Sequence, residues 1–227
     1  MTLETGRLPA SGVESMFDRI APVYDAMNRV MTAGLDQRWR RLTAAVTVRP
    51  GDEVLDGCCG TGDLAVACTR AGGRVTGLDF SERMLERARR KAPDVTWVRG
   101  DLLQLPFQTA SFDAATVGFG VRNVDDLQQA LRELRRVLRT DGRIGILEIT
   151  RPRGFLRHFY GLWFDRVVPL LGRVLPVGAA YAYLPASVRR FPAPEELAKL
   201  MRSAGFEEVR YRLFAGGIVA LHAGAAS

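Results

Sequence analysis

Residues 54–65 read VLDGCCGTGDLA, and this stretch decides the fold. A short apolar strand ends in Asp56, a bend of small residues follows, and a helix begins near Asp63. Such a unit places backbone N–H groups and a helix N-terminus beside a ligand. The glycines of the bend let the backbone approach that ligand where a side chain would collide. The stretch therefore predicts an α/β sheet with a ligand site at the carboxyl end of this strand.

Strands and helices alternate outward from this stretch. The periodicity predicts strands at 53–56, 74–79, 95–99, 112–117 and 143–149, with helices at 63–71, 82–91 and 127–138 between them. Upstream, residues 13–47 have helical periodicity with breaks at Pro22 and Gly34. Downstream, a helix is expected at 194–204, and strands 209–214 and 218–222 flank the turn Ala215-Gly216-Gly217.

This order predicts one α/β domain over residues 1–227. Its sheet is doubly wound, seven-stranded and mostly parallel, and it ends in an antiparallel hairpin. We expect N-terminal helices at 13–48, a ligand-binding core at 51–150, a helical cap at 151–192, and a C-terminal helix and hairpin at 193–227.

The composition limits the partners, the metal sites and the cellular compartment that can be expected for this domain. The formal charge is +7, and Lys91 and Lys199 are the only lysines. This arginine bias fits either a GC-rich coding sequence or an anionic partner, which would be a membrane or a nucleic acid. Three cysteines and two histidines predict neither a disulfide framework nor a metal site. The sequence also shows no signal peptide and no uninterrupted apolar span, so we expect a cytoplasmic protein.

Acidic residues follow three of the predicted strands. Asp56 ends the first strand and suits an ammonium group, and Asp79 ends the second and can accept hydrogen bonds from ribose hydroxyls. Asp101 and Leu102 follow the third, where a carboxylate and a backbone N–H can bind an adenine edge. Residues 60–65 also satisfy the dinucleotide pattern G-x-G-x-x-A, but Asp56 would repel a pyrophosphate. The set indicates a nucleoside with a positively charged tail.

Several longer motifs of the sequence resemble the motifs of known protein families. Residues 54–63, 77–85 and 112–113 resemble the motifs of class I S-adenosylmethionine-dependent methyltransferases, which have a Rossmann-like fold. Residues 16–25 (MFDRIAPVYD), 118–124 (GFGVRNV) and 181–188 (YAYLPASV), with 191–192 (FP), resemble the C-methyltransferases of menaquinone and ubiquinone biosynthesis.

The resemblance implies that S-adenosylmethionine is the cofactor. It also implies a set of cofactor-binding residues: Asp56, Gly60, Thr61, Asp79, Asp101, Leu102 and Gly118. Two positions depart from the pattern. Cys58 stands where the superfamily often has glycine, and Gly118 stands where many relatives carry serine, so that only a backbone contact remains there.

The implied reaction is methylation of a ring carbon of a demethylated polyprenyl quinol, with demethylmenaquinol preferred over the benzoquinol and phytyl naphthoquinol analogues. Ionisation of the neighbouring hydroxyl would make that carbon nucleophilic, so a base or a base-held water is expected near the ring. The catalytic candidates are Arg122, Asn123, Tyr24, Asp25 and Tyr181. Arg122 stays charged and could stabilise a phenolate, or it could simply pair with Asp125 or Asp126.

Other classes fit less well. An RNA methyltransferase should carry an Asn/Asp-Pro-Pro-aromatic run or a nucleophilic cysteine after the fourth strand, and residues 117–122 offer neither. A small-molecule O- or N-methyltransferase and a cofactor-binding assembly partner stay open. We expect a prenylated quinol as substrate, peripheral contact with an anionic membrane at its inner face, and no nucleic acid, with a homodimer left open.

Overall fold

A computed structural model describes residues 9–151 and 178–227. The N-terminal segment forms α1 (Ala10–Ile20), η1 (Ala21–Val23), α2 (Tyr24–Thr32) and α3 (Leu35–Thr47). Both predicted breaks are present. Pro22 lies in the single turn η1, and α2 ends where Ala33 and Gly34 adopt positive φ angles of 49° and 76°. The helical segment is therefore divided as its sequence predicts.

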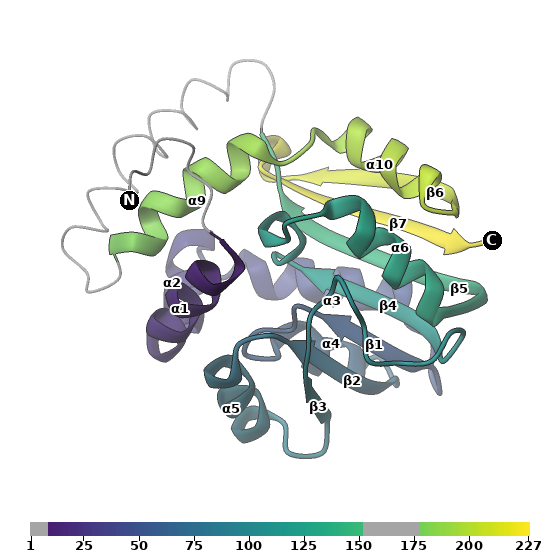
Figure 1. Cartoon of the computed structure of the whole chain (residues 1–227), viewed down its shortest axis with the longest axis horizontal. Coiled ribbons are helices and arrows are strands. Elements are labelled where there is room, and N and C mark those ends of the chain that lie inside the picture. Colours follow the sequence, from purple (N-terminus) through teal and green to yellow (C-terminus); the bar gives the residue numbers. More distant parts are fainter. Residues whose placement is uncertain (1–8, 152–177) are drawn as a thin grey trace.

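One sheet organises the rest of the chain (Figure 1), with the strand order β3-β2-β1-β4-β5-β7-β6. The strands are β1 (Glu53–Gly57), β2 (Arg74–Asp79), β3 (Thr96–Arg99), β4 (Phe112–Gly118), β5 (Leu138–Ile149), β6 (Phe206–Phe214) and β7 (Val219–Ala226). The pairs from β3 to β5 are parallel, whereas β7 is antiparallel to both β5 and β6. The predicted seven-stranded sheet with an antiparallel end is confirmed.

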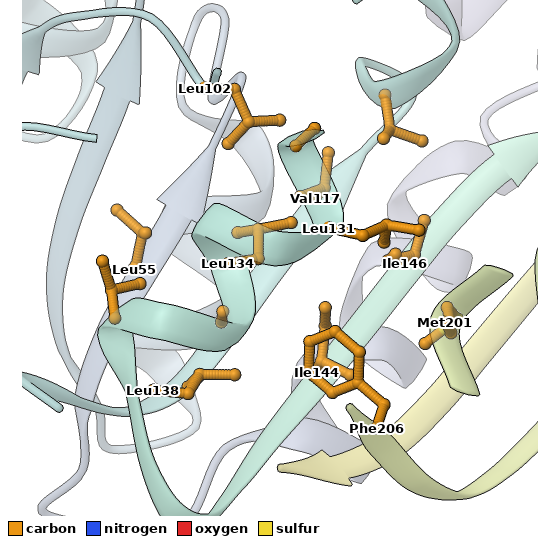
Figure 2. Close-up of a cluster of buried hydrophobic side chains, with 14 of the residues drawn as sticks. Leu55, Leu102, Val117, Leu131, Leu134, Leu138, Ile144, Ile146, Met201 and Phe206 are labelled. Atoms are coloured by element: carbon orange, nitrogen blue, oxygen red, sulfur yellow. The ribbon is translucent and has the colours of Figure 1, made fainter. Parts of the chain in front are cut away.

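Helices cover both faces of this sheet. The remaining helices are α4 (Asp63–Arg70), α5 (Glu82–Lys91), η2 (Val121–Asn123), α6 (Leu127–Val137), α9 (Gly178–Arg190), α10 (Pro194–Ser203) and η4 (Ala215–Gly217). Figure 2 shows the larger core, where Leu131 and Leu134 of α6 and Met201 of α10 pack on Val117 and Ile146 of the sheet. Residues of α3 and α4 build a second core on the opposite face. The sheet is therefore doubly wound.

Three strands, β5, β6 and β7, are several residues longer than predicted. Thr140-Asp141-Gly142 falls between the helix predicted at 127–138 and the strand predicted at 143–149, but it lies inside β5, because the chain bulges there and Asp141 adopts φ 61°. The pairing register shifts at this bulge, since Phe112 pairs with Leu138 but Ala114 already pairs with Arg143. The hairpin strands extend to Phe206 and Ala226 because β7 pairs along both its edges.

The expected cap is described only in part. Residues 152–177 of the cap predicted at 151–192 lie outside the described residues, whereas α9 belongs to the part of the cap that is described. Within 9–151 and 178–227, no helix is long and apolar enough to cross a bilayer.

Candidate active site

A cavity of about 300 Å³ opens at the carboxyl ends of β1 to β4. Its walls come from the bend after β1, the ends of the next strands and the helix α1. The predicted cofactor residues Gly60, Thr61, Asp79, Asp101, Leu102 and Gly118 all line it. Parallel strands bring these positions to one edge of the sheet, although they are far apart in sequence.

The bend after β1 depends on left-handed backbone angles. Gly60 and Gly62 have φ angles of 55° and 86°, and a Cβ at Gly62 would lie 2.5 Å from the ring of Trp97. Cys58 also takes a positive φ, 52°, although it carries a side chain. Its Cβ would lie 2.3 Å from a Cβ built at Gly120, so Gly120 is what leaves room for Cys58. The departure at Cys58 thus packs the bend against the loop after β4.

Asp79 joins this bend to β2. One of its carboxylate oxygens accepts a hydrogen bond from the Gly60 backbone N–H (2.8 Å), and the other accepts one from the Ser81 N–H (3.0 Å). Burial raises the pKa of Asp79 to about 6 although these hydrogen bonds oppose the shift. The carboxylate therefore fixes the bend and also faces the cavity.

Asp56 is completely buried beside the same bend. It accepts a hydrogen bond from Thr116 Oγ1 at 2.8 Å, while its other oxygen, Oδ2, has no partner among the described residues. Burial raises the pKa of Asp56 to about 7, against the hydrogen bond from Thr116. Asp56 is not among the described residues that line the cavity, so it lies behind the cavity wall.

Asp101 and Gly118 lie on opposite sides of the cavity. Asp101 accepts a hydrogen bond from the Leu103 N–H at 2.9 Å and shapes the turn after β3. A Cβ at Gly118 would lie 2.9 Å from Leu64 Cδ2 and 3.2 Å from Arg40 Nη1. The space that a serine would need at position 118 is thus filled in this chain by Leu64 and Arg40.

Asp25 of α2 fastens the N-terminal helices to the cofactor bend. Thr61 Oγ1 donates to Asp25 at 2.5 Å, and Lys91 Nζ donates to Asp25 at 2.7 Å and to Asp63 at 2.6 Å. Burial alone would raise the pKa of Asp63, but the Lys91 ammonium outweighs it and the pKa is lowered. Sequence reasoning missed Lys91 and Asp63, because these contacts link residues far apart in the chain.

A second helix contact reinforces this attachment. Ser81 Oγ caps α5 by accepting from the Met84 N–H at 3.2 Å, and it donates to Asp18 of α1 at 2.6 Å. Phe17 and Tyr24 lie in the wall of the cavity beside these contacts. The N-terminal helices therefore cover the predicted cofactor site.

A second cavity, of about 230 Å³, adjoins the first. The two share Asn123, Val124 and Asp125 as lining residues. Arg122 of η2 and Tyr183 of α9 line the second cavity. The loop after β4 thus forms the boundary between the cavities.

Arg122 is held by a buried ion pair that the sequence analysis did not find. Its Nη1 donates to Glu148 Oε1 at 2.7 Å and to the Phe119 carbonyl, and its backbone N–H donates to Glu148 at 3.2 Å. The two side chains are 8% and 1% exposed. Although burial alone would lower the pKa of Arg122, the Glu148 charge outweighs it and the pKa is raised. The one sequence feature that could have revealed this ion pair is Glu148 itself, an acidic residue inside the apolar strand β5.

Asn123 and Tyr183 line the second cavity together with Arg122. Asn123 Oδ1 is buried and has no hydrogen-bond partner among the described residues. Tyr183 is buried under the Arg190 guanidinium, which lies 5.8 Å from the ring centroid, and burial raises the pKa of its phenol. Tyr181 belongs to α9, but its side chain lies outside the described residues.

Arg40 of α3 also lines the cofactor cavity, and sequence reasoning missed it. It is 5% exposed, and its guanidinium lies 5.1 Å from the Phe119 ring centroid. Its helix is rich in arginine, so no sequence feature distinguishes Arg40 from its neighbours.

Both the sequence and the fold of this chain are similar to those of known methyltransferases. The profile of the ubiE/COQ5 methyltransferase family matches residues 5–226. A demethylmenaquinone methyltransferase of Roseiflexus sp. (strain RS-1) is 46% identical over 95% of this chain and 93% of its own. A ubiquinone/menaquinone biosynthesis C-methyltransferase of Desulfotalea psychrophila is 44% identical over 94% of this chain and 89% of its own. Among solved structures, a SAM-dependent methyltransferase of Thermotoga maritima matches 94% of this chain and 99% of its own, with a TM-score of 0.64 and 25% identity.

Proposed function

Because this chain belongs to the ubiE/COQ5 methyltransferase family, we propose that it methylates a ring carbon of demethylmenaquinol with S-adenosylmethionine as the methyl donor. The names of relatives at 40–46% identity support the naphthoquinol. The name of one relative also covers ubiquinone biosynthesis, so the benzoquinol is the second candidate.

The first cavity has the donors and acceptors that this cofactor needs. Asp79 and Asp101 offer carboxylate oxygens to ribose hydroxyls and an adenine amine, and Gly60 and Thr61 form the adjoining wall. Asp56 Oδ2 lies buried behind that wall and has no hydrogen-bond partner among the described residues. When bound, S-adenosylmethionine supplies an electrophilic methyl group on a sulfonium.

The observation that carries the proposal is the junction of the two cavities. They meet at Asn123, Val124 and Asp125, so an acceptor in the second cavity adjoins a donor in the first. Alignment of two bound reactants is the main contribution a protein can make to a transfer of this kind.

Arg122 is placed to stabilise the ionised quinol. Arg122 lines the second cavity, and the hydrogen bond to Glu148 fixes its guanidinium. Arginine is a poor base because it stays protonated, so its role here is to favour a phenolate or to orient a water. The unpartnered Asn123 Oδ1 can accept a hydrogen bond from that hydroxyl or water.

The tyrosines and Asp25 have different tasks. The raised pKa of Tyr183 keeps its phenol protonated at neutral pH, which makes it a hydrogen-bond donor to the ring oxygen. Tyr24 lines the cofactor cavity, and Tyr181 stays a candidate from the same helix as Tyr183. Asp25 is bound to Thr61 and Lys91, so it positions the cofactor bend and does not act on the quinol.

We further propose that the chain works in the cytoplasm at the inner face of a membrane. A polyprenyl quinol stays in the bilayer, and a formal charge of +7 favours contact with anionic lipid. Co-sedimentation with vesicles of anionic or neutral phospholipid tests this. Binding to both kinds of vesicle alike would contradict it.

The test of the reaction is transfer of labelled methyl from S-adenosylmethionine. Demethylmenaquinol, the demethylated ubiquinone precursor and bulk tRNA are offered in parallel. Label on a ring carbon of the naphthoquinol is expected, and label on the benzoquinol alone would reassign the ring. Label on tRNA alone would refute the proposal. Arg122→Met should lose transfer while still binding the cofactor, because Arg122 lines only the second of the two described cavities.

A further inference from the structure

The cofactor cavity is strongly acidic. Five carboxylates are among its described lining residues: Glu14, Asp63, Asp79, Asp101 and Asp125. Such a wall suits the ribose, the adenine amine, the sulfonium and the ammonium of S-adenosylmethionine. It repels the carboxylate at the end of the methionine arm, and none of the residues assigned so far binds that group. One described residue of the lining carries a positive charge, and it is Arg40.

Arg40 reaches the cavity from α3, beside the end of β4. Its Nη1 lies 3.2 Å from the place a Cβ would take at Gly118, which is one of the positions expected to contact the cofactor. The Phe119 ring stacks against the guanidinium and limits its rotation. The guanidinium is thus held at the cavity edge where β4 ends, beside Gly118 and Phe119.

The hydrogen bonding of Arg40 is incomplete. The side chain is 5% exposed, yet its Nε has no hydrogen-bond partner among the described residues. Its ion pair with Asp36 joins Nε and Oδ2 at 3.7 Å, which is too long for a hydrogen bond. Asp36 already accepts from Thr32 Oγ1 at 3.0 Å. A buried guanidinium has five N–H donors, and a carboxylate is the acceptor that matches their geometry best.

We propose that Arg40 binds the carboxylate of the methionine arm of the cofactor. This inference rests on the proposed function only in taking S-adenosylmethionine as the cofactor. Asp36 then holds the guanidinium from behind, and the ligand carboxylate satisfies donors on the cavity side. This role also explains the glycine at position 118, because the Arg40 guanidinium occupies the space that a serine side chain would need there.

The test compares two nucleosides that differ only in this carboxylate. S-adenosylhomocysteine carries it, and decarboxylated S-adenosylhomocysteine keeps the amine but lacks it. Dissociation constants for both are measured by calorimetry with the full chain and with Arg40→Met, Arg40→Lys and Arg41→Met. Arg41 is the matched control because it is an exposed neighbour on the same helix whose Nε donates to the Gln37 carbonyl.

The intact chain should prefer S-adenosylhomocysteine over the decarboxylated nucleoside by between about 10-fold and 100-fold, the range of a charge-assisted pair. Arg40→Met should abolish this preference by weakening S-adenosylhomocysteine alone. Arg40→Lys should keep part of the preference, and Arg41→Met should keep all of it. Unchanged binding of the decarboxylated nucleoside to Arg40→Met shows that the variant is folded.

Two results would overturn the inference. Equal weakening of both nucleosides by Arg40→Met would make Arg40 a structural residue, and an unchanged preference would place the carboxylate elsewhere. In either case quinol methylation by the intact chain leaves the proposed function standing. An intact chain that binds neither nucleoside would refute both.

Discussion

Glu148→Gln should be among the most destabilising single substitutions near the active site. Glu148 is 1% exposed and accepts from both the side chain and the backbone N–H of Arg122, at 2.7 and 3.2 Å. Neutralising it leaves a buried guanidinium without its counter-charge. Loss of one partner of a buried pair costs about 3–5 kcal/mol. The free energy of unfolding should fall by that amount.

The assay is equilibrium unfolding in urea with the ligand-free protein. For m-values of about 2–3 kcal/mol/M, the midpoint should fall by roughly 1–2.5 M. Glu82→Gln is the matched control, because its pair with Arg89 is equally short, 2.6 Å, but the two side chains are 43% and 42% exposed. An exposed pair contributes less than about 1 kcal/mol, so this control should scarcely move the midpoint.

A double variant separates stability from function. Arg122→Met with Glu148→Gln removes both charges and keeps an amide oxygen that can accept from the Arg122 backbone N–H, so no buried charge is left without its partner. Its stability should return to within about 1 kcal/mol of the intact chain. Quinol methylation should stay lost, because the guanidinium is absent. A midpoint for Glu148→Gln no lower than that for Glu82→Gln would refute this reasoning, and so would methylation by the double variant.

Three further outcomes follow from single contacts. The pKa of Asp56 is raised by burial to about 7, so the stability that its proton confers is complete below about pH 4 and is lost as pH rises through 7. Urea unfolding of the ligand-free chain between pH 5 and 8 should show this decline, and Asp56→Asn should flatten it. Ser81→Ala removes the cap on the Met84 N–H and should lower the unfolding free energy by about 1 kcal/mol, measured the same way. Gly62→Ala combines φ 86° with a contact of 2.5 Å to the Trp97 ring, and should cost more than about 1 kcal/mol and weaken nucleoside binding in calorimetry. Wild-type behaviour of any of these variants would contradict the contact assigned to it.

The fold could be predicted because its signals are local. Turn residues bound each strand, and α5 begins and ends at the residues predicted from the sequence, Glu82 and Lys91. The exception is β5, where Thr140-Asp141-Gly142 has turn chemistry but forms a bulge. Pairing with β4 resumes past that bulge, and a neighbouring strand cannot be seen from a single segment.

Site residues could be predicted from the sequence only where the sheet topology alone brings them together. Asp79 and Asp101 end strands, and a parallel sheet gathers such ends at one edge. Arg40, Lys91 and Glu148 were missed because each acts through a contact between distant elements. Lys91 reaches Asp25 across 66 positions of sequence, and no periodicity records a pair of that kind.

The arginine bias also has a structural explanation. Arg143 joins β5 to the Thr47 carbonyl at the end of α3 and to Asp52 before β1. Arg136 donates both to Glu133 and to carbonyls of the loop before β4. One planar guanidinium can serve a carboxylate and a carbonyl together, whereas an ammonium offers only a point charge. Arginines that connect elements in this way are not available to a membrane. Attraction to anionic lipid therefore has to come from exposed charges such as those at the end of α5, and the vesicle experiment should respond to Arg90→Gln.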